Sequence, residues 1–231
     1  MKYKLFAFVL CFSSWFLLTA QKTNQTKKER IEIAETLIKN LHDGYLLVRL
    51  SNRQKTIDVL IKSGQESRAK QYSEKLAREN QALVTAFKNY YSFCPVYFFY
   101  SNQSKYVLNK EFGKVDFLDD SLKTDPSIKP EKSQYLIAEI TNIEQDTTSR
   151  YEDTYIVPGE SGPETRSTYS GGTDFGFQAM IVKTENFVQI RKPFPFYVRT
   201  FDSLPIKRKP STIVKKLNSQ LNAYYWEVNQ N

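Results

Sequence analysis

Few residues of this chain have the type and spacing that catalysis or metal binding requires. Its 231 residues include one histidine, His42, and two cysteines, Cys11 and Cys94. A Ser-His-Asp or Cys-His site would have to use His42, but no G-x-S-x-G segment marks a nucleophile. These soft ligands are also too few for a zinc site. The sequence therefore favours a protein that is not an enzyme and holds no metal or cofactor, and we expect His42 to contact the last carbonyls of a helix.

Cys94 is expected to be a small packing residue rather than a reactive thiol. It stands immediately before Pro95 and a run of aromatic residues that predicts a buried strand. Burial raises the pKa of a thiol and makes it inert. Because Cys11 lies in an apolar leader, no internal disulfide is expected.

Three polar residues, Ser101, Asn102 and Ser104, are the candidates for a binding site. They follow the predicted strand 96–100 and open a predicted helix. In open α/β sheets, ligands bind beyond the carboxyl ends of strands, and helix N-termini attract anions. The segment has no glycine to bring the backbone close to a phosphate, so helix capping by these side chains is the alternative.

The chain is basic, with a formal net charge of +8 that falls by the charges of Lys2 and Lys4 if the leader is removed. Basic clusters occur at 191–192, 207–209 and 215–216. We expect a solvated basic face, with contact to an anionic envelope glycan or lipid surface as the alternative. Pro205 and Pro210 flank the middle cluster and argue against a groove-reading helix, so no nucleic-acid partner is expected.

The first twenty residues have the order of a secretory signal peptide. Lys2 and Lys4 precede the apolar run 5–18, and small residues precede Gln21. This order predicts cleavage after Ala20. A membrane anchor is the alternative, but the apolar run has 14 residues, against about 20 for a spanning helix. Lipidation at Cys11 is disfavoured by the bulky Leu10 before it.

The N-terminal part is predicted to be mainly helical. Apolar residues spaced by three and four indicate helices over 28–43, 56–62 and 68–91. Gly44 suits the end of the first helix, and the dense apolar run 45–50 reads as a buried strand, with one continuous helix to Ser63 as the alternative.

The rest of the chain is predicted to be α/β. Strands at 96–100 and 115–118 around a short helix indicate a βαβ unit with a parallel pair, and 135–143 alternates as a central strand does. We expect a loop over 147–172, a hairpin of 175–183 with 187–191, an exit from the sheet at 192–195, and a final helix from Pro210.

These elements predict an α/β (or α+β) fold: a mixed central sheet with helices on both faces, preceded by an N-terminal helical segment. We expect residues 21–92 to form the mainly helical part and 93–231 the sheet part with its flexible loop. The two parts are expected to make one compact domain.

Two resemblances add to this reading. The element order over 93–225 resembles that of thioredoxin-like proteins, although the active-site cysteine pair is absent. The leader's end and the runs at 43–50, 94–100 and 192–197 resemble uncharacterised exported proteins of the Bacteroidota. That resemblance implies a periplasmic or outer-membrane location with other envelope proteins as partners. It also makes the sites of pattern Asp-Ser/Thr-apolar or Asp-Thr-Thr, at Ser121, Thr147 and Ser203, candidates for O-glycosylation.

We therefore expect a non-enzymatic cell-envelope protein that acts as an accessory subunit or binding module. The alternative is a degenerate thioredoxin-like or other α/β enzyme with a site near residues 101–104. A concave pocket with convergent polar groups would favour the enzyme, and an exposed apolar patch would favour the interaction subunit.

Overall fold

The computed structural model describes residues 27–131, 133–144, 150–156, 163–169, 177–201 and 207–230. Its α-helices are α1 (Lys27–Asp43), α2 (Gln54–Lys62), α3 (Glu66–Tyr90), α4 (Ser104–Leu108) and α5 (Pro210–Gln230). Its strands are β1 (Tyr45–Leu50), β2 (Val96–Tyr100), β3 (Tyr135–Asn142), β4 (Arg150–Ile156), β5 (Pro163–Tyr169), β6 (Gln178–Lys183) and β7 (Tyr197–Arg199). Two 3₁₀ turns, η1 (Ser101–Gln103) and η2 (Phe112–Lys114), flank α4.

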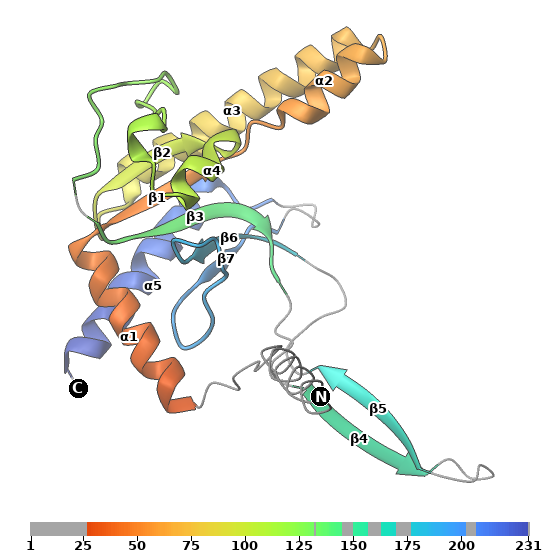
Figure 1. Ribbon diagram of the computed structural model, residues 1–231, viewed down its shortest axis with the longest axis vertical. Helices are drawn as coiled ribbons and strands as arrows, with labels where there is room; N and C mark the ends of the chain where they lie inside the picture. The colour runs from red at the N-terminus through yellow and green to blue at the C-terminus, as the bar shows by residue number, and fades with distance from the viewer. Residues whose placement is uncertain are drawn as a thin grey trace, which may run out of the picture.

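Five strands form one mixed sheet in the order β2-β1-β3-β6-β7 (Figure 1). β1 runs parallel to β2 and β3, whereas β6 is antiparallel to β3 and to β7. Helices α2 and α3 make the crossover from β1 to β2, as a parallel pair requires. β4 and β5 pair only with each other, as an antiparallel hairpin.

One face of the sheet packs against the three long helices α1, α3 and α5. Every second residue of β1, starting at Leu46, points to this side, because side chains alternate along a strand. These residues share a cluster with Ile38 of α1, Phe87 of α3 and Leu217 of α5, all fully buried. This layer contains most of the core.

The opposite face is covered by α4 and the connections around it. Tyr45 and Leu47 of β1 and Phe99 of β2 are buried there with Val107 of α4 and Phe117. The sheet therefore has helices on both faces, and the predicted fold class is confirmed. The finer expectation of a thioredoxin-like topology stays a prediction.

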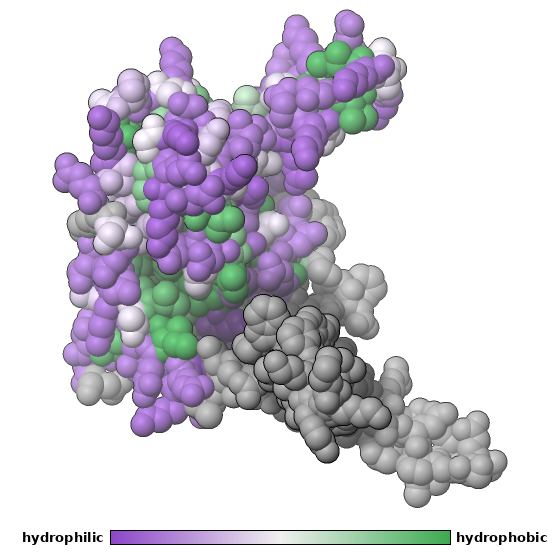
Figure 2. Space-filling view, viewed as in Figure 1, coloured by the Kyte–Doolittle hydropathy of each residue, from purple (hydrophilic) through white to green (hydrophobic). Residues whose placement is uncertain are grey.

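α2 and the first half of α3 form an arm that projects past the sheet (Figure 1). α2 contains no buried residue, and Ala69 is the one buried residue of α3 before Asn80. Figure 2 shows that the arm stands clear of the body and that hydrophilic side chains cover most of its visible surface. The base of this arm, where α3 leaves the sheet, is where a cavity forms.

Several predicted elements are confirmed. The buried strands 45–50 and 96–100 and the central strand 135–143 are β1, β2 and β3, and the three N-terminal helices and the C-terminal helix lie within a few residues of their predicted bounds. β1 is buried on both sides, as its dense apolar run predicts.

Three expectations about the second half of the chain are wrong. Residues 115–118 are not a strand beside 96–100, because Leu118 makes one antiparallel bridge to Phe98 while β1 is the parallel partner of β2. Residues 187–191 contribute one bridge, Lys183 to Gln189, instead of a hairpin strand. The chain leaves the sheet at 192–195 as expected and re-enters it as β7, a strand that the sequence did not indicate. The expected loop 147–172 contains the paired strands β4 and β5; its remaining residues lie outside the described ranges.

Candidate functional site

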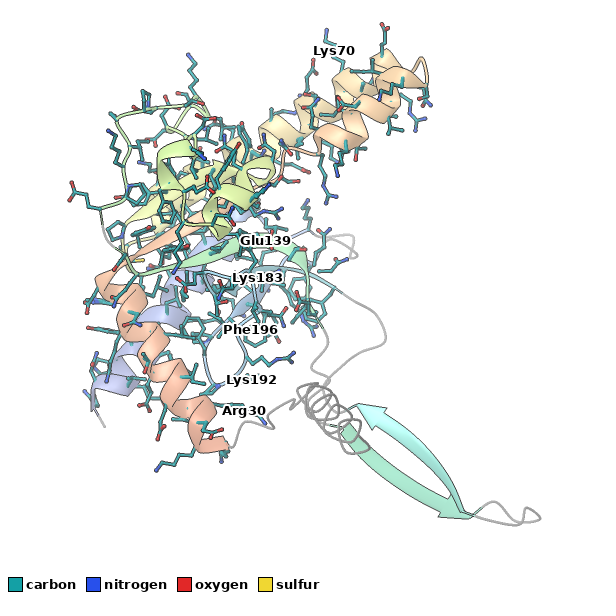
Figure 3. The ribbon with its side chains drawn as sticks, viewed as in Figure 1. Arg30, Lys70, Glu139, Lys183, Lys192 and Phe196 are labelled. Carbon is teal, nitrogen blue, oxygen red and sulfur yellow. The ribbon has the colours of Figure 1, made fainter. Side chains whose placement is uncertain are left out.

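A charged cluster lies on the α4 side of the sheet. Arg49 of β1 and Glu139 of β3 are register partners, so their side chains emerge on the same face. The Arg49 guanidinium donates a hydrogen bond to Glu139 Oε2, and Lys183 Nζ of β6 lies 3.0 Å from Glu139 Oε1. Figure 3 shows Glu139 and Lys183 next to each other on neighbouring strands. One carboxylate thus holds two cations from the strands on either side.

The cluster is largely withdrawn from water. The side chains of Glu139 and Lys183 are 7% and 10% exposed. A second carboxylate, Glu144, lies 3.5 Å from Lys183. Two cations therefore face two carboxylates, and the cluster carries no net charge. This balance is what allows ionised groups to remain in a buried position.

The predicted binding residues Ser101 and Ser104 join this cluster. Arg49 Nε donates to Ser104 Oγ at 2.7 Å, and Ser104 Oγ donates to the carbonyl of Ser101 at 2.7 Å. Ser101 Oγ donates to Asn52 Oδ1 at 3.0 Å. Neither serine caps η1 or α4, so the capping alternative is wrong. The serines anchor Arg49 and the end of β1.

Asn102, the third predicted binding residue, does not take part in this network. It is exposed, and its side chain makes no hydrogen bond with the described part of the chain. The structure therefore brings two of the three predicted residues together, through contacts with Arg49 and Asn52 that the sequence did not indicate.

A cavity of about 530 Å³ lies at the base of the arm, beside the carboxyl ends of β1 and β3. One wall is α3 between Tyr72 and Leu83, and the opposite wall is the segment from Lys207 to Ile213 that opens α5. Leu50 and Ile140 belong to its floor. Volumes of about 300–1,000 Å³ are usual for small-molecule sites, and the ends of parallel strands are a favoured position for them.

The lining of this cavity is strongly cationic. Against one carboxylate, Glu79, it contains seven basic side chains: Arg49, Arg53, Lys75, Arg78, Lys207, Arg208 and Lys209. Three of them have carboxylate partners, because Arg49 pairs with Glu139, Arg78 lies 3.9 Å from Glu74, and Lys207 lies 3.7 Å from Glu79.

The other four basic residues leave the cavity with uncompensated positive charge. Arg53, Lys75 and Lys209 make no ion pair with the described part of the chain. Arg208 donates to the carbonyl of Arg199 at 2.9 Å and stacks on Phe201 at 4.3 Å, neither of which neutralises its charge. Like charges gathered on two facing walls raise the local concentration of anions.

The floor of the cavity is apolar, and two of the polar side chains in its lining donate to backbone carbonyls. Leu50, Leu83 and Ile213 are buried beneath it. Asn80 Nδ2 donates to the carbonyl of Ser51 at 2.9 Å, and Thr200 Oγ1 donates to the carbonyl of Gln178 at 2.9 Å. The cavity thus combines a cationic rim with a floor that offers mainly hydrocarbon.

His42 and Cys94 lie outside this cavity. The His42 ring stacks on Tyr225 at 4.0 Å, and Nδ1 lies 3.1 Å from Asp43 Oδ1, so the expected contact with helix carbonyls is wrong. Cys94 is half-buried against the core, 3.3 Å from the Tyr91 hydroxyl. Burial, with a smaller contribution from Cys94, raises the pKa of Tyr91 well above its usual value. Both residues pack between elements.

The other predicted sites are only partly described. Ser121 is exposed in the connection before β3, whereas Thr147 and Ser203 lie outside the described residues, as does the leader. Of the predicted basic clusters, 207–209 lines the cavity, and Lys192 and Lys216 line a smaller hollow that shares Arg208 with it. The sequence missed Arg49, Arg53, Lys75 and Arg78, which are scattered over two elements and a turn.

Comparisons with known proteins identify no relative. No protein-family model, curated protein or solved structure matches this chain. The described residues contain no group of three or more His, Cys, Asp and Glu side chains that could hold a metal ion. None of the helices in the described ranges has the length and hydropathy that a membrane-spanning segment needs.

Proposed function

We propose that this protein is a non-enzymatic binding module of the cell envelope that holds an anionic ligand in the cavity at the base of the arm. The observation that carries the proposal is the charge of the cavity, seven basic side chains against one carboxylate. Basic residues that serve only solubility would be spread over the surface, whereas these are concentrated around one cavity.

The position of the cations supports binding rather than solubility. Arg53 follows β1, Lys75 projects from α3, and Lys209 precedes α5, so three separate elements bring positive charge to one cavity. The N-terminus of α5, a helix of 21 residues, lies at the same wall and adds the positive end of its dipole. An anion bound there would contact cations on opposite sides.

The alternative, an enzyme with a site near residues 101–104, has less support. Ser101 and Ser104 are engaged with Asn52 and Arg49, and the base that would activate a serine is not among their partners. The carboxylate nearest to them, Glu139, is occupied by two cations. These contacts fix the end of β1 and leave neither serine beside a general base.

Location in the envelope rests on the sequence of residues 1–20, whose order is that of a secretory signal peptide. We propose export with cleavage after Ala20 and a periplasmic or outer-membrane-associated place of action beside other envelope proteins. A basic cavity suits that setting, because acidic lipids and glycans are abundant ligands of the envelope.

Calorimetric titration with pyrophosphate at low ionic strength tests the proposal. The triple variant Arg53→Glu, Lys75→Glu, Lys209→Glu reverses the three unpaired cations of the cavity. The control triple, Lys39→Glu, Lys62→Glu, Lys70→Glu, changes the net charge equally at exposed positions outside the cavity, and Figure 3 places Lys70 on the arm, away from the sheet.

We expect pyrophosphate to bind the unaltered protein saturably and to bind the cavity triple at least tenfold more weakly, while the control triple differs little. Circular dichroism melts establish that all three proteins are folded. Equal weakening in both triples would show a general charge effect and would contradict a cavity site.

A further inference from the structure

We infer that the ligand of this cavity is an anionic amphiphile, an alkyl or acyl chain that carries a phosphate or carboxylate head. The inference rests on the proposed function and adds the chemical class of the ligand. Its starting point is the division of the cavity into a cationic rim and an apolar floor.

The floor of the cavity exposes an apolar side chain on the face of the sheet that the three long helices α1, α3 and α5 otherwise cover. Leu136, Ala138 and Ile140 alternate along β3 toward the three long helices, and the first two are buried whereas Ile140 is 37% exposed. Ile140 lines the cavity at the base of the arm that α2 and the first half of α3 form (Figure 1). An alkyl chain on this floor would remove Ile140 from water and complete the packing of the layer.

Apolar side chains from three directions surround Ile140. Leu50 and Leu83 come from β1 and α3, and Ile213 comes from the first turn of α5. Tyr72 and Leu76, both half-buried, extend the same lining along α3 toward the arm. Apolar side chains therefore line the cavity from the sheet to the part of α3 that enters the arm.

The polar groups of the floor favour a chain over a sugar. Asn80 and Thr200 each commit one donor to a backbone carbonyl, which leaves the floor fewer donors for the hydroxyl groups of a glycan. A sugar with many hydroxyls would leave several of its hydrogen-bonding groups unpaired against Leu50, Leu83 and Ile140. A hydrocarbon chain has no such groups and loses nothing there.

The head of the amphiphile is assigned to the cations at the rim. Lys75 stands on the α3 wall and Lys209 on the facing wall, with Arg53 at the turn after β1. Their aliphatic stems can cover part of the chain while the charged ends meet the head group. Salt bridges from a phosphate or carboxylate to these groups need no rearrangement of existing ion pairs, because none of the three has one within the described residues.

A chain-length series tests the inference. Butyl, hexyl and octyl phosphate are titrated below their critical micelle concentrations, with pyrophosphate as an anion that has no chain. Each buried methylene should strengthen binding about fourfold, the equivalent of about 0.8 kcal/mol. Phosphatidylglycerol vesicles in a sedimentation assay distinguish a lipid held in a bilayer from a monomeric amphiphile such as a fatty acid.

Two matched variants locate the chain. Ile140→Asn places an amide on the floor, and Val188→Asn makes the same kind of change at a residue that is 60% exposed outside the cavity. Ile140→Asn should flatten the dependence on chain length while pyrophosphate binds as before. Val188→Asn should leave both properties unchanged. Because Ile140 is partly exposed, we expect the Ile140→Asn variant to fold, and a thermal melt checks this.

The outcomes separate this inference from the proposed function. Pyrophosphate binding that responds to the cavity triple, combined with no gain from longer chains, would overturn the amphiphile and leave the anion site intact. Tighter binding of acidic oligogalacturonates than of octyl phosphate would overturn it in favour of a glycan. Absence of binding by every anion would refute both.

Discussion

Replacing Glu139 by glutamine removes the carboxylate that Arg49 and Lys183 share. The Glu139 side chain is 7% exposed and bonds a cation with each oxygen. Removing one partner of a buried ion pair costs about 3–5 kcal/mol, because the remaining charge stays buried without compensation. Lys183 retains Glu144 at 3.5 Å and the Arg49 side chain is 30% exposed. We therefore expect the low end, about 3 kcal/mol.

Urea denaturation followed by circular dichroism measures this loss. With a slope of about 2 kcal/mol per molar urea, Glu139→Gln should lower the midpoint by about 1.5 M. The control is Asp120→Asn, which breaks the exposed pair of Lys88 and Asp120 at 2.9 Å. A surface pair is worth less than about 1 kcal/mol, so the control midpoint should move by less than about 0.5 M.

A double-mutant cycle isolates the interaction between Glu139 and Lys183. Lys183→Met alone leaves Glu139 with Arg49, Glu139→Leu alone leaves Lys183 with Glu144, and the double variant Glu139→Leu, Lys183→Met replaces both buried groups by apolar ones. The double variant should be more stable than the sum of the two single losses predicts, by about 1–3 kcal/mol. Additive losses, or a Glu139→Gln midpoint no lower than that of the control, would refute the reasoning that the cluster is buried and coupled.

Four further predictions follow from individual residues. Phe98→Ala should cost about 3–5 kcal/mol in chemical denaturation, because Phe98 is 2% exposed; an unchanged midpoint would place β2 outside the core. Gly44→Ala should cost about 3 kcal/mol or more, because its Cβ would lie 2.1 Å from the Gln134 carbonyl oxygen, whereas Gly113→Ala meets open space and should be nearly neutral. Burial, with the charge of Glu185 adding to it, raises the pKa of Tyr135 to about 12. Between about pH 10 and pH 12, Tyr135 should therefore ionise in the unfolded chain but not in the folded protein. The free energy of unfolding should then fall by about 1.4 kcal/mol for each pH unit over this range. Tyr135→Phe should reduce that slope, and an identical slope in both proteins would show that Tyr135 ionises in the folded state. N-terminal sequencing of the exported protein should find Gln21 first, and a retained Met1 would contradict cleavage.

The strands of the sheet could be predicted where apolar residues occupy both the odd and the even positions of a segment. β1 and β3 carry apolar side chains on alternate and intervening positions, which is what burial on two faces demands. Residues 115–118 have the same composition, but they make one bridge to the sheet and otherwise cover its α4 face, where Val115 and Phe117 are buried in one cluster with Phe99. Composition alone does not distinguish a strand in a sheet from a segment that packs on one.

The polar strands were missed for the opposite reason. β4 and β5 have few aliphatic residues, and their signal was the frequency of threonine and tyrosine, residues that favour strands. β7 was missed because Pro193 and Pro195 end the preceding segment, and its three residues are too short for an alternating pattern.

The charged cluster left a signal in the sequence that could have been read. Arg49 and Glu139 each interrupt an apolar run that predicts a buried strand, and a buried charge requires a partner of opposite sign. The cavity left no comparable signal. Its cations are distributed over β1, α3 and the start of α5, and only the fold makes them neighbours.

Backbone amide shifts of ¹⁵N-labelled protein, recorded during titration with octyl phosphate, test the central claim most directly because they report where the ligand lies. The account predicts saturable changes that are largest at Arg53, Lys75, Ile140 and Lys209, which surround the cavity at the base of the arm. Largest changes around Lys192 and Phe196, which line the smaller hollow and are labelled in Figure 3, would contradict it, as would changes that fail to saturate.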